Sequence, residues 1–71
     1  MVNKFKLKGK IAERGLRQDE VASLIGTSPA SFSAKMNGRS GFTVSEVDLL
    51  RNVLKLDKED VFNIFFADDV I

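Results

Sequence analysis

The sequence predicts one small all-α domain. Apolar residues recur three and four positions apart in several segments, and residues that favour helix ends stand before and after these segments. No segment alternates apolar and polar residues between turn residues, as a half-buried strand would. With 71 residues, and with neither Cys nor His, the chain has room for a single domain, residues 1–71, held by apolar packing or by a partner.

The first two helices are expected over about residues 4–14 and 18–25. Each is followed by a glycine, Gly15 or Gly26, and glycine is the residue that most readily adopts the left-handed conformation of a helix end. Each segment also carries apolar residues on one face at the spacing of a helix turn. These residues are Leu7 and Ile11 in the first helix, and Val21, Ala22 and Ile25 in the second.

The third helix is expected over about residues 29–37. Ser28 is a good N-cap, and Pro29 is tolerated at the first helical position because its missing N–H would have no partner there. Phe32 and Met36 are one turn apart and are expected to face the core. An Asn-Gly step then ends the helix.

Two further helices begin at capping residues. Thr43 and Glu46 have the form of a capping box, and Asp57 caps a fifth helix that is expected to run to about residue 66. The expected apolar faces are Val47, Leu50, Val53 and Leu54 in the fourth helix, with Phe42 packing before it, and Val61, Ile64 and Phe65 in the fifth, with Phe62 and Phe66 beside them.

The charges are distributed unevenly along the chain, although the net charge is only +1. Residues 1–39 hold eight Lys or Arg against three Asp or Glu, a balance of +5. Residues 40–71 hold three basic residues against seven acidic ones, a balance of −4. The N-terminal half is therefore basic, which favours an anionic partner such as nucleic acid, although a solvated surface would also show such charges.

Several function classes find no support in the sequence. Without His or Cys there is no nucleophile–base pair to propose, so we expect neither an enzyme nor a bound metal or other cofactor, and no small-molecule substrate. No apolar run approaches the roughly 20 residues that cross a bilayer, and no signal peptide is recognised. A cytoplasmic protein that does not associate with a membrane is expected.

The segment of residues 18–37 has the pattern of a helix-turn-helix. Two short helices that cross at a steep angle need a small residue at their close approach and a turn residue that tolerates positive φ. They also need a large apolar residue that locks the second helix onto the first. Ala22, Gly26 and Phe32 meet these needs at spacings of four and then six residues.

The stretch Gln18–Ser28, which reads QDEVASLIGTS, resembles the helix-turn-helix of the Cro and cI-type repressors, the xenobiotic-response-element family. That family typically reads T/S-Q-x-x-L-A-x-x-x-G-V-S, followed by a helix with an N-G or E-x-G ending. The resemblance extends to the spacing of the fourth and fifth helices. It implies a compact five-helix lambda-repressor-like DNA-binding domain with a central helix-turn-helix. Small regulators of temperate phages of low-GC Gram-positive bacteria are similar in length and in their Phe-Phe ending.

Three departures from the family pattern bear on function. Thr27 stands where the family usually has Val or Ile, and Lys35 takes a position that is often apolar. The third departure is the outward face of the third helix, which is expected to consist of Pro29, Ala30, Ser33, Ala34 and Asn37, with both alanines exposed. No Arg or Gln projects from this face for a bidentate contact with a base, so direct readout of DNA would be weak.

Two hypotheses follow from the resemblance. In the first, the protein is a Cro-like regulator of a lysis–lysogeny switch in a bacterial host and binds duplex operator DNA. In the second, it is an antirepressor, similar to the modulators of repression, that docks on the phage's main repressor and masks its DNA-binding face. A homodimer is compatible with both. The expected contact residues are Arg17, Gln18, Ser28, Pro29, Ala30, Ser33, Ala34, Asn37 and Arg39.

Each of these residues also has a plainer role. Gln18 would serve as part of a helix start, and the alanines would serve as helix-forming residues on an ordinary surface. Arg17 and Arg39 would then be solvated charges rather than phosphate contacts, and Lys35 is equally open to either reading. The basic half of the chain favours DNA, whereas the alanine-rich face and the low net charge favour a protein partner.

Overall fold

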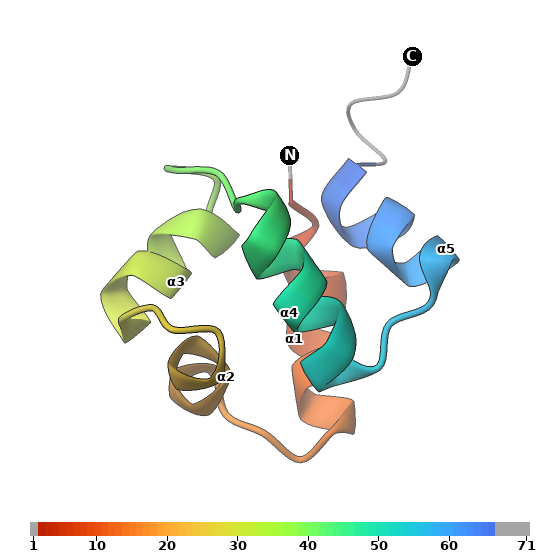
Figure 1. The fold of residues 1–71 in the computed structure, drawn as a ribbon, viewed down its shortest axis with the longest axis horizontal. Helices are drawn as coiled ribbons and strands as arrows, with labels where there is room; N and C mark the ends of the chain where they lie inside the picture. The colour runs from red at the N-terminus through yellow and green to blue at the C-terminus, as the bar shows by residue number, and fades with distance from the viewer. Residues whose placement is uncertain (1, 67–71) are drawn as a thin grey trace.

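A computed structural model of the chain describes residues 2–66 and shows an all-α fold (Figure 1). Five α-helices follow one another in these residues, and a short π-helical segment, η1, continues the last of them. No strand occurs within residues 2–66, so the predicted fold class is confirmed. The elements are α1 (Lys4–Glu13), α2 (Gln18–Leu24), α3 (Pro29–Met36), α4 (Val44–Leu54), α5 (Lys58–Val61) and η1 (Phe62–Phe66).

The helices are arranged so that α3 and α5 lie at opposite sides of the molecule, with α4 and α1 between them and α2 beside α3 (Figure 1). In the part of the chain that the structure describes, none of these helices is long and apolar enough to cross a membrane.

Helix starts and ends follow the capping residues that the sequence indicates. Ser28 accepts a hydrogen bond from the N–H of Ser31, and Thr43 accepts one from the N–H of Glu46, each at 3.1 Å. Gly26 ends α2 in the left-handed conformation, with φ at 77°. A Cβ at this position would have no atom within 4 Å, so the backbone conformation and not a lack of space calls for glycine.

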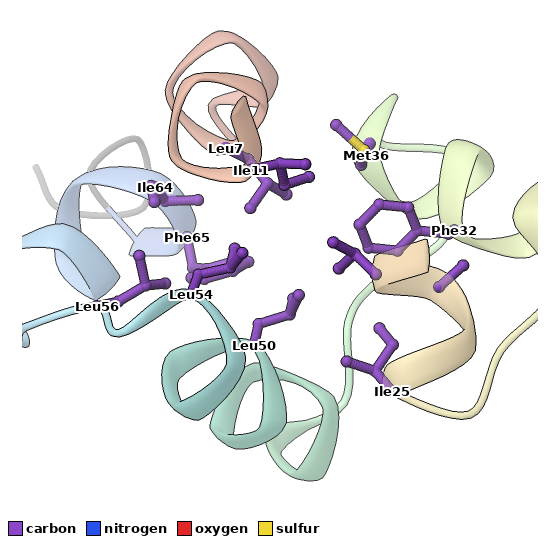
Figure 2. Close-up of a cluster of buried hydrophobic side chains, with 12 residues drawn as sticks. Leu7, Ile11, Ile25, Phe32, Met36, Leu50, Leu54, Leu56, Ile64 and Phe65 are labelled. Carbon is purple, nitrogen blue, oxygen red and sulfur yellow. The ribbon is translucent and has the colours of Figure 1, made fainter. Parts of the chain in front are cut away.

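The core (Figure 2) is built from side chains of α1 to α4 and of η1, and each buried member except one belongs to a predicted apolar face. Val47, Val53 and Val61, which were expected on the same faces, are only partly buried against it. Leu56, which belongs to none of the predicted apolar faces, is also buried in the core. Lys55 ends α4 in the left-handed conformation, with φ at 55°, and this reversal turns Leu56 inward. The buried residues are Leu7, Ile11, Val21, Ala22, Ile25, Phe32, Met36, Leu50, Leu54, Leu56, Ile64 and Phe65.

The fifth helix departs from expectation. A continuous α-helix to residue 66 was predicted, but α5 ends at Val61 and the chain continues as the π-helical segment η1. A π-helix closes its hydrogen bonds over five residues, so successive side chains turn through a smaller angle than in an α-helix. Ile64 and Phe65 are both buried, in agreement with the apolar face expected of the fifth helix. Phe62 and Phe66 remain about half exposed.

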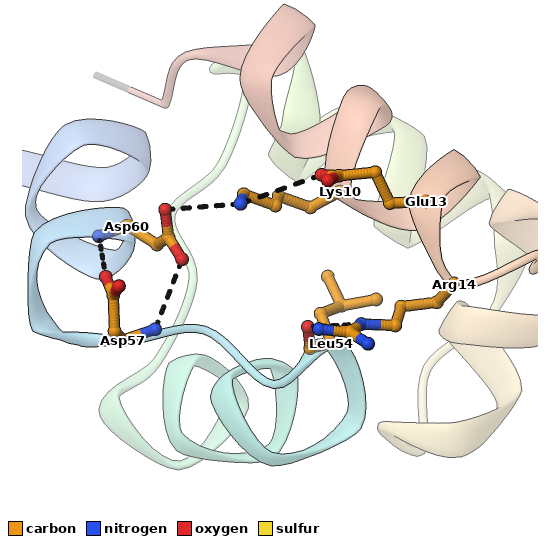
Figure 3. A network of polar contacts seen from close by, with 6 residues as sticks. All are labelled: Lys10, Glu13, Arg14, Leu54, Asp57 and Asp60. Atoms are coloured by element: carbon orange, nitrogen blue, oxygen red, sulfur yellow. Dashed lines mark hydrogen bonds and ion pairs between the residues drawn. The ribbon is translucent and has the colours of Figure 1, made fainter.

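Polar contacts join α1 to the C-terminal half of the chain (Figure 3). The Arg14 Nε–H donates to the carbonyl oxygen of Leu54 at 3.0 Å, and Lys10 Nζ lies 3.3 Å from Asp60 Oδ1. Asp60 also accepts a hydrogen bond from the N–H of Asp57, at 3.2 Å. This N–H and the Lys10 ammonium lower the pKa of Asp60. These contacts hold α5 in place beside α1, so they support the position of η1.

Candidate helix-turn-helix binding surface

Helices α2 and α3 occupy the segment in which the sequence predicts a helix-turn-helix. Residues 25–28 connect them, and the N–H of Thr27 donates to the carbonyl of Ala22 at 2.9 Å, which closes the end of α2. Phe32 is 1% exposed and packs in the same core as Val21 and Ala22, which are both 0% exposed. The face of α3 that carries Phe32 and Met36 is therefore fixed inward, and the opposite face is directed to solvent.

The outward face of α3 is small and largely apolar. Pro29, Ala30, Ser33 and Asn37 are exposed, as predicted. Ala34 is only partly exposed, so the prediction that both alanines are exposed is wrong for this one. After α3 the chain reverses, and the N–H of Arg39 donates to the Ala34 carbonyl at 2.9 Å. The reversal keeps the chain close to the last turn of α3, where Ala34 lies.

Asn37 is held by hydrogen bonds on both sides of its amide. Its Nδ2 donates to the carbonyl of Ser33 at 2.9 Å, and its Oδ1 accepts from Lys4 Nζ at 3.2 Å. Lys4 begins α1, so this contact brings a basic side chain from the N-terminus to the C-terminal end of α3. Lys4 is not among the expected contact residues, because no local pattern reveals a contact between residues 33 positions apart.

Other predicted site residues are committed to local contacts. The Ser28 hydroxyl caps α3. Arg17 lies at the N-cap position of α2, and its Nε is 3.2 Å from Asp19 Oδ1 and 3.9 Å from Glu20 Oε1. The hydrogen bond with Asp19 raises the pKa of Arg17 and lowers the pKa of Asp19. Two neighbouring carboxylates offset the charge of Arg17, which weakens it as a contact for phosphate.

Gln18 and Arg39 remain exposed, at the first position of α2 and just after α3. Within residues 2–66, Arg39 makes no ion pair with a carboxylate. In the same range, no three Asp or Glu side chains are grouped so that they could hold a metal ion. The structure thus brings Lys4, Ser33 and Asn37 together at one end of α3, whereas the pairing of Arg17 sets it apart from them.

A family model described as "Protein of unknown function (DUF739)" matches residues 1–68. The chain belongs to the DUF739 family. The matched range includes every element of this DUF739 protein from α1 to η1. No curated protein and no solved structure matches the chain.

An ion pair fixes α3 of the DUF739 protein to α4. Lys35 Nζ contacts Glu46 Oε2, and the two side chains are only 17% and 14% exposed. Glu46 Oε1 also accepts the N–H of Thr43 at 2.9 Å and so completes the capping box of α4. Lys35 therefore serves the fold and is not available to neutralise a phosphate.

This ion pair predicts a specific acid sensitivity. The hydrogen bond from Lys35, followed by the N–H of Thr43, lowers the pKa of Glu46 below its ordinary value. The contribution of a carboxylate with a lowered pKa is complete above its unfolded pKa and is lost as pH falls through the folded pKa. Near neutral pH, we expect the unfolding free energy of the wild type to exceed that of a Glu46→Gln variant. The difference should shrink as the pH falls from the unfolded pKa of Glu46 through its lower folded pKa.

Urea unfolding at a series of pH values measures this difference. Glutamine keeps an acceptor for the Thr43 N–H, so the comparison isolates the charge. Asp19 and Asp60, whose pKa values are also lowered, are present in both proteins and cancel. A difference that stays constant across the acid range would contradict the assignment.

Proposed function

We propose that this protein is a small phage-type transcription regulator of a lysis–lysogeny switch that binds duplex operator DNA through α2 and α3 in the cytoplasm of a bacterial host. The observation that carries the proposal is the outward face of α3. It has no acidic side chain, it is exposed over most of its length, and Lys4 and Arg39 border its C-terminal end. A protruding helix of this shape and charge suits the major groove of DNA.

The contacts available on this surface favour phosphates over bases. Arg39 and Lys4 supply positive charge, and Gln18 supplies an amide near the start of α2. Among the outward residues of α3, the Asn37 amide is already engaged, which leaves Ser33 and the methyl group of Ala30 to meet base edges. Affinity from phosphate neutralisation would therefore exceed the contribution of direct readout.

The salt dependence of DNA binding tests the proposal. Affinity for an arbitrary duplex should fall with rising salt, with a log–log slope of about −0.9 for each contacted phosphate. Arg39→Ala should weaken binding to all sequences alike and reduce the slope by about 1. Fluorescence anisotropy with a labelled duplex measures both quantities.

The matched control is Lys58→Ala, which removes one positive charge from α5 at the side of the molecule opposite α3. It should leave the slope unchanged. An absence of binding to any duplex at low salt would overturn the proposal.

A second function is favoured by a different property of the same surface. Pro29 and Ala30 are exposed and Ala34 is partly exposed, while the Asn37 amide has its hydrogen bonds satisfied within the protein. Such a surface is apolar, has few side-chain conformations to lose, and is suited to packing against another protein. This supports an antirepressor that docks on the phage's main repressor and masks its DNA-binding face.

A further inference from the structure

An apolar groove of about 500 Å³ lies between the first turns of α4 and the segment η1. Val47 and Phe65 contribute to its lining, and Phe42 connects it to the core through edge-to-face contacts with Phe65 at 5.6 Å and Phe32 at 5.8 Å between ring centroids. None of the residues that line the groove belongs to α2 or α3, so the groove is distinct from the helix-turn-helix surface.

Exposed apolar side chains stand at the same groove. Val44, in the first turn of α4, is 87% exposed, and Phe66, at the end of η1, is 46% exposed. The same surface therefore carries both an apolar groove and exposed apolar side chains. In an interface with two-fold symmetry, each copy presents the same surface, so a surface that carries both a hollow and a projection can pair with itself.

The charges at the groove are also self-complementary. Asp48 and Arg51 both line it, one turn apart on α4, with Arg51 Nη2 3.0 Å from Asp48 Oδ1. Their side chains are 59% and 49% exposed, so both can reach a partner. Because the groove carries one acidic and one basic side chain, its charge favours neither an acidic nor a basic partner. Across a two-fold axis, however, Asp48 of each copy can meet Arg51 of the other.

We propose that a second copy of this chain occupies the groove, with Val44 and Phe66 of each copy packed against the groove of the other. No residue of α3 lines the groove, so the contacts of this homodimer do not use the outward face of α3. The inference does not depend on the proposed function, because it rests on a separate surface.

Sedimentation equilibrium of the full chain tests the dimer. The mass should rise from monomer to dimer within the micromolar to millimolar range, about −8 to −4 kcal/mol in association free energy. Val44→Glu should give a folded monomer, because an acidic residue is favourable in the first turn of a helix but is costly in an apolar interface. Leu24→Glu changes an apolar residue of α2 that is 56% exposed, and it should remain a dimer.

A charge exchange tests the identity of the partner. Asp48→Arg and Arg51→Asp should each be monomeric alone, because each surface then repels its own copy. An equimolar mixture of the two should form a heterodimer. Circular dichroism would establish that each variant is folded.

Three results would overturn the inference. The first is a wild type that stays monomeric up to about 1 mM. The second is a dimer that Val44→Glu leaves intact. The third is a monomeric wild type in which deletion of residues 67–71 shifts the NMR signals of the residues that line the groove. That result would mean that the chain's own C-terminal residues, and not a second copy, occupy the groove. DNA binding by such a monomer would leave the proposed function standing.

Discussion

Phe32→Ala is expected to abolish folding. The side chain is 1% exposed, and its ring packs edge to face against Phe42 with 5.8 Å between centroids. Truncating a buried Phe costs roughly 3–5 kcal/mol, which matches the lower end of the total stability of small domains, about 5 kcal/mol. Far-UV circular dichroism and urea titration should show a largely unfolded chain at 25 °C.

Phe5→Ala provides the matched control for this change. Phe5 is 74% exposed on α1, so the same truncation should alter the unfolding free energy by no more than about 0.5 kcal/mol. If Phe32→Ala instead melted like the wild type, α3 would have to be oriented with its other face toward the core.

Ala30→Glu is expected to cause the largest loss of function without a loss of fold. Ala30 is exposed in the first turn of α3, where an acidic side chain is compatible with the helix. In a DNA-binding protein the new carboxylate would face phosphates and bases, so binding to duplex DNA should fall steeply. In an antirepressor the same carboxylate would disrupt a close-packed contact with the repressor.

The measurement therefore reads both partners in parallel, duplex DNA and the N-terminal domain of the cognate repressor. Ala12→Glu makes the identical change at an exposed position of α1 and should leave both interactions intact. Tight binding of the wild type to the repressor, with DNA competing for the same repressor surface, would favour the antirepressor. Unimpaired binding of both partners by Ala30→Glu would remove α3 from the functional surface.

The sequence was sufficient to predict most of the helix boundaries, because local chemistry decides them. Ser28, Thr43 and Asp57 cap the helices that follow them, and Gly15 and Gly26 adopt the positive φ that was expected of them. Each of these positions is determined within a few residues of chain. Phe32 and Met36 lie in the core as predicted, since periodicity alone identifies the inner face of α3.

The features that escaped prediction depend on contacts between distant segments. The π-helical turn of η1 arises where Ile64 and Phe65 both pack into a core built by other helices. Leu56 is buried because a lysine adopts a left-handed conformation that propensity would not assign to it.

At the candidate site, the residues on the outward face of α3 could be predicted from the sequence. The contacts and the exposure of their side chains could not. The sequence could not show that Lys4 reaches Asn37, that Arg17 pairs with Asp19, or that Ala34 is partly covered. These contacts decide which polar groups remain available to a partner. The proposals on function therefore rest on the residues that stay available, above all Arg39 and Ala30.

The hydrogen bond from the N–H of Asn3 to the carbonyl of Ile64, at 2.7 Å, has a consequence for the order of folding. It joins segments near the two ends of the described chain, so forming it closes almost the longest loop available, at an entropic cost that grows with loop length. Helices α2 and α3 meet across a short turn and can pair early. We expect η1 to dock last and to open first, with the fastest amide exchange among the helices. A second copy bound in the groove would contact η1 and would therefore slow amide exchange in this segment.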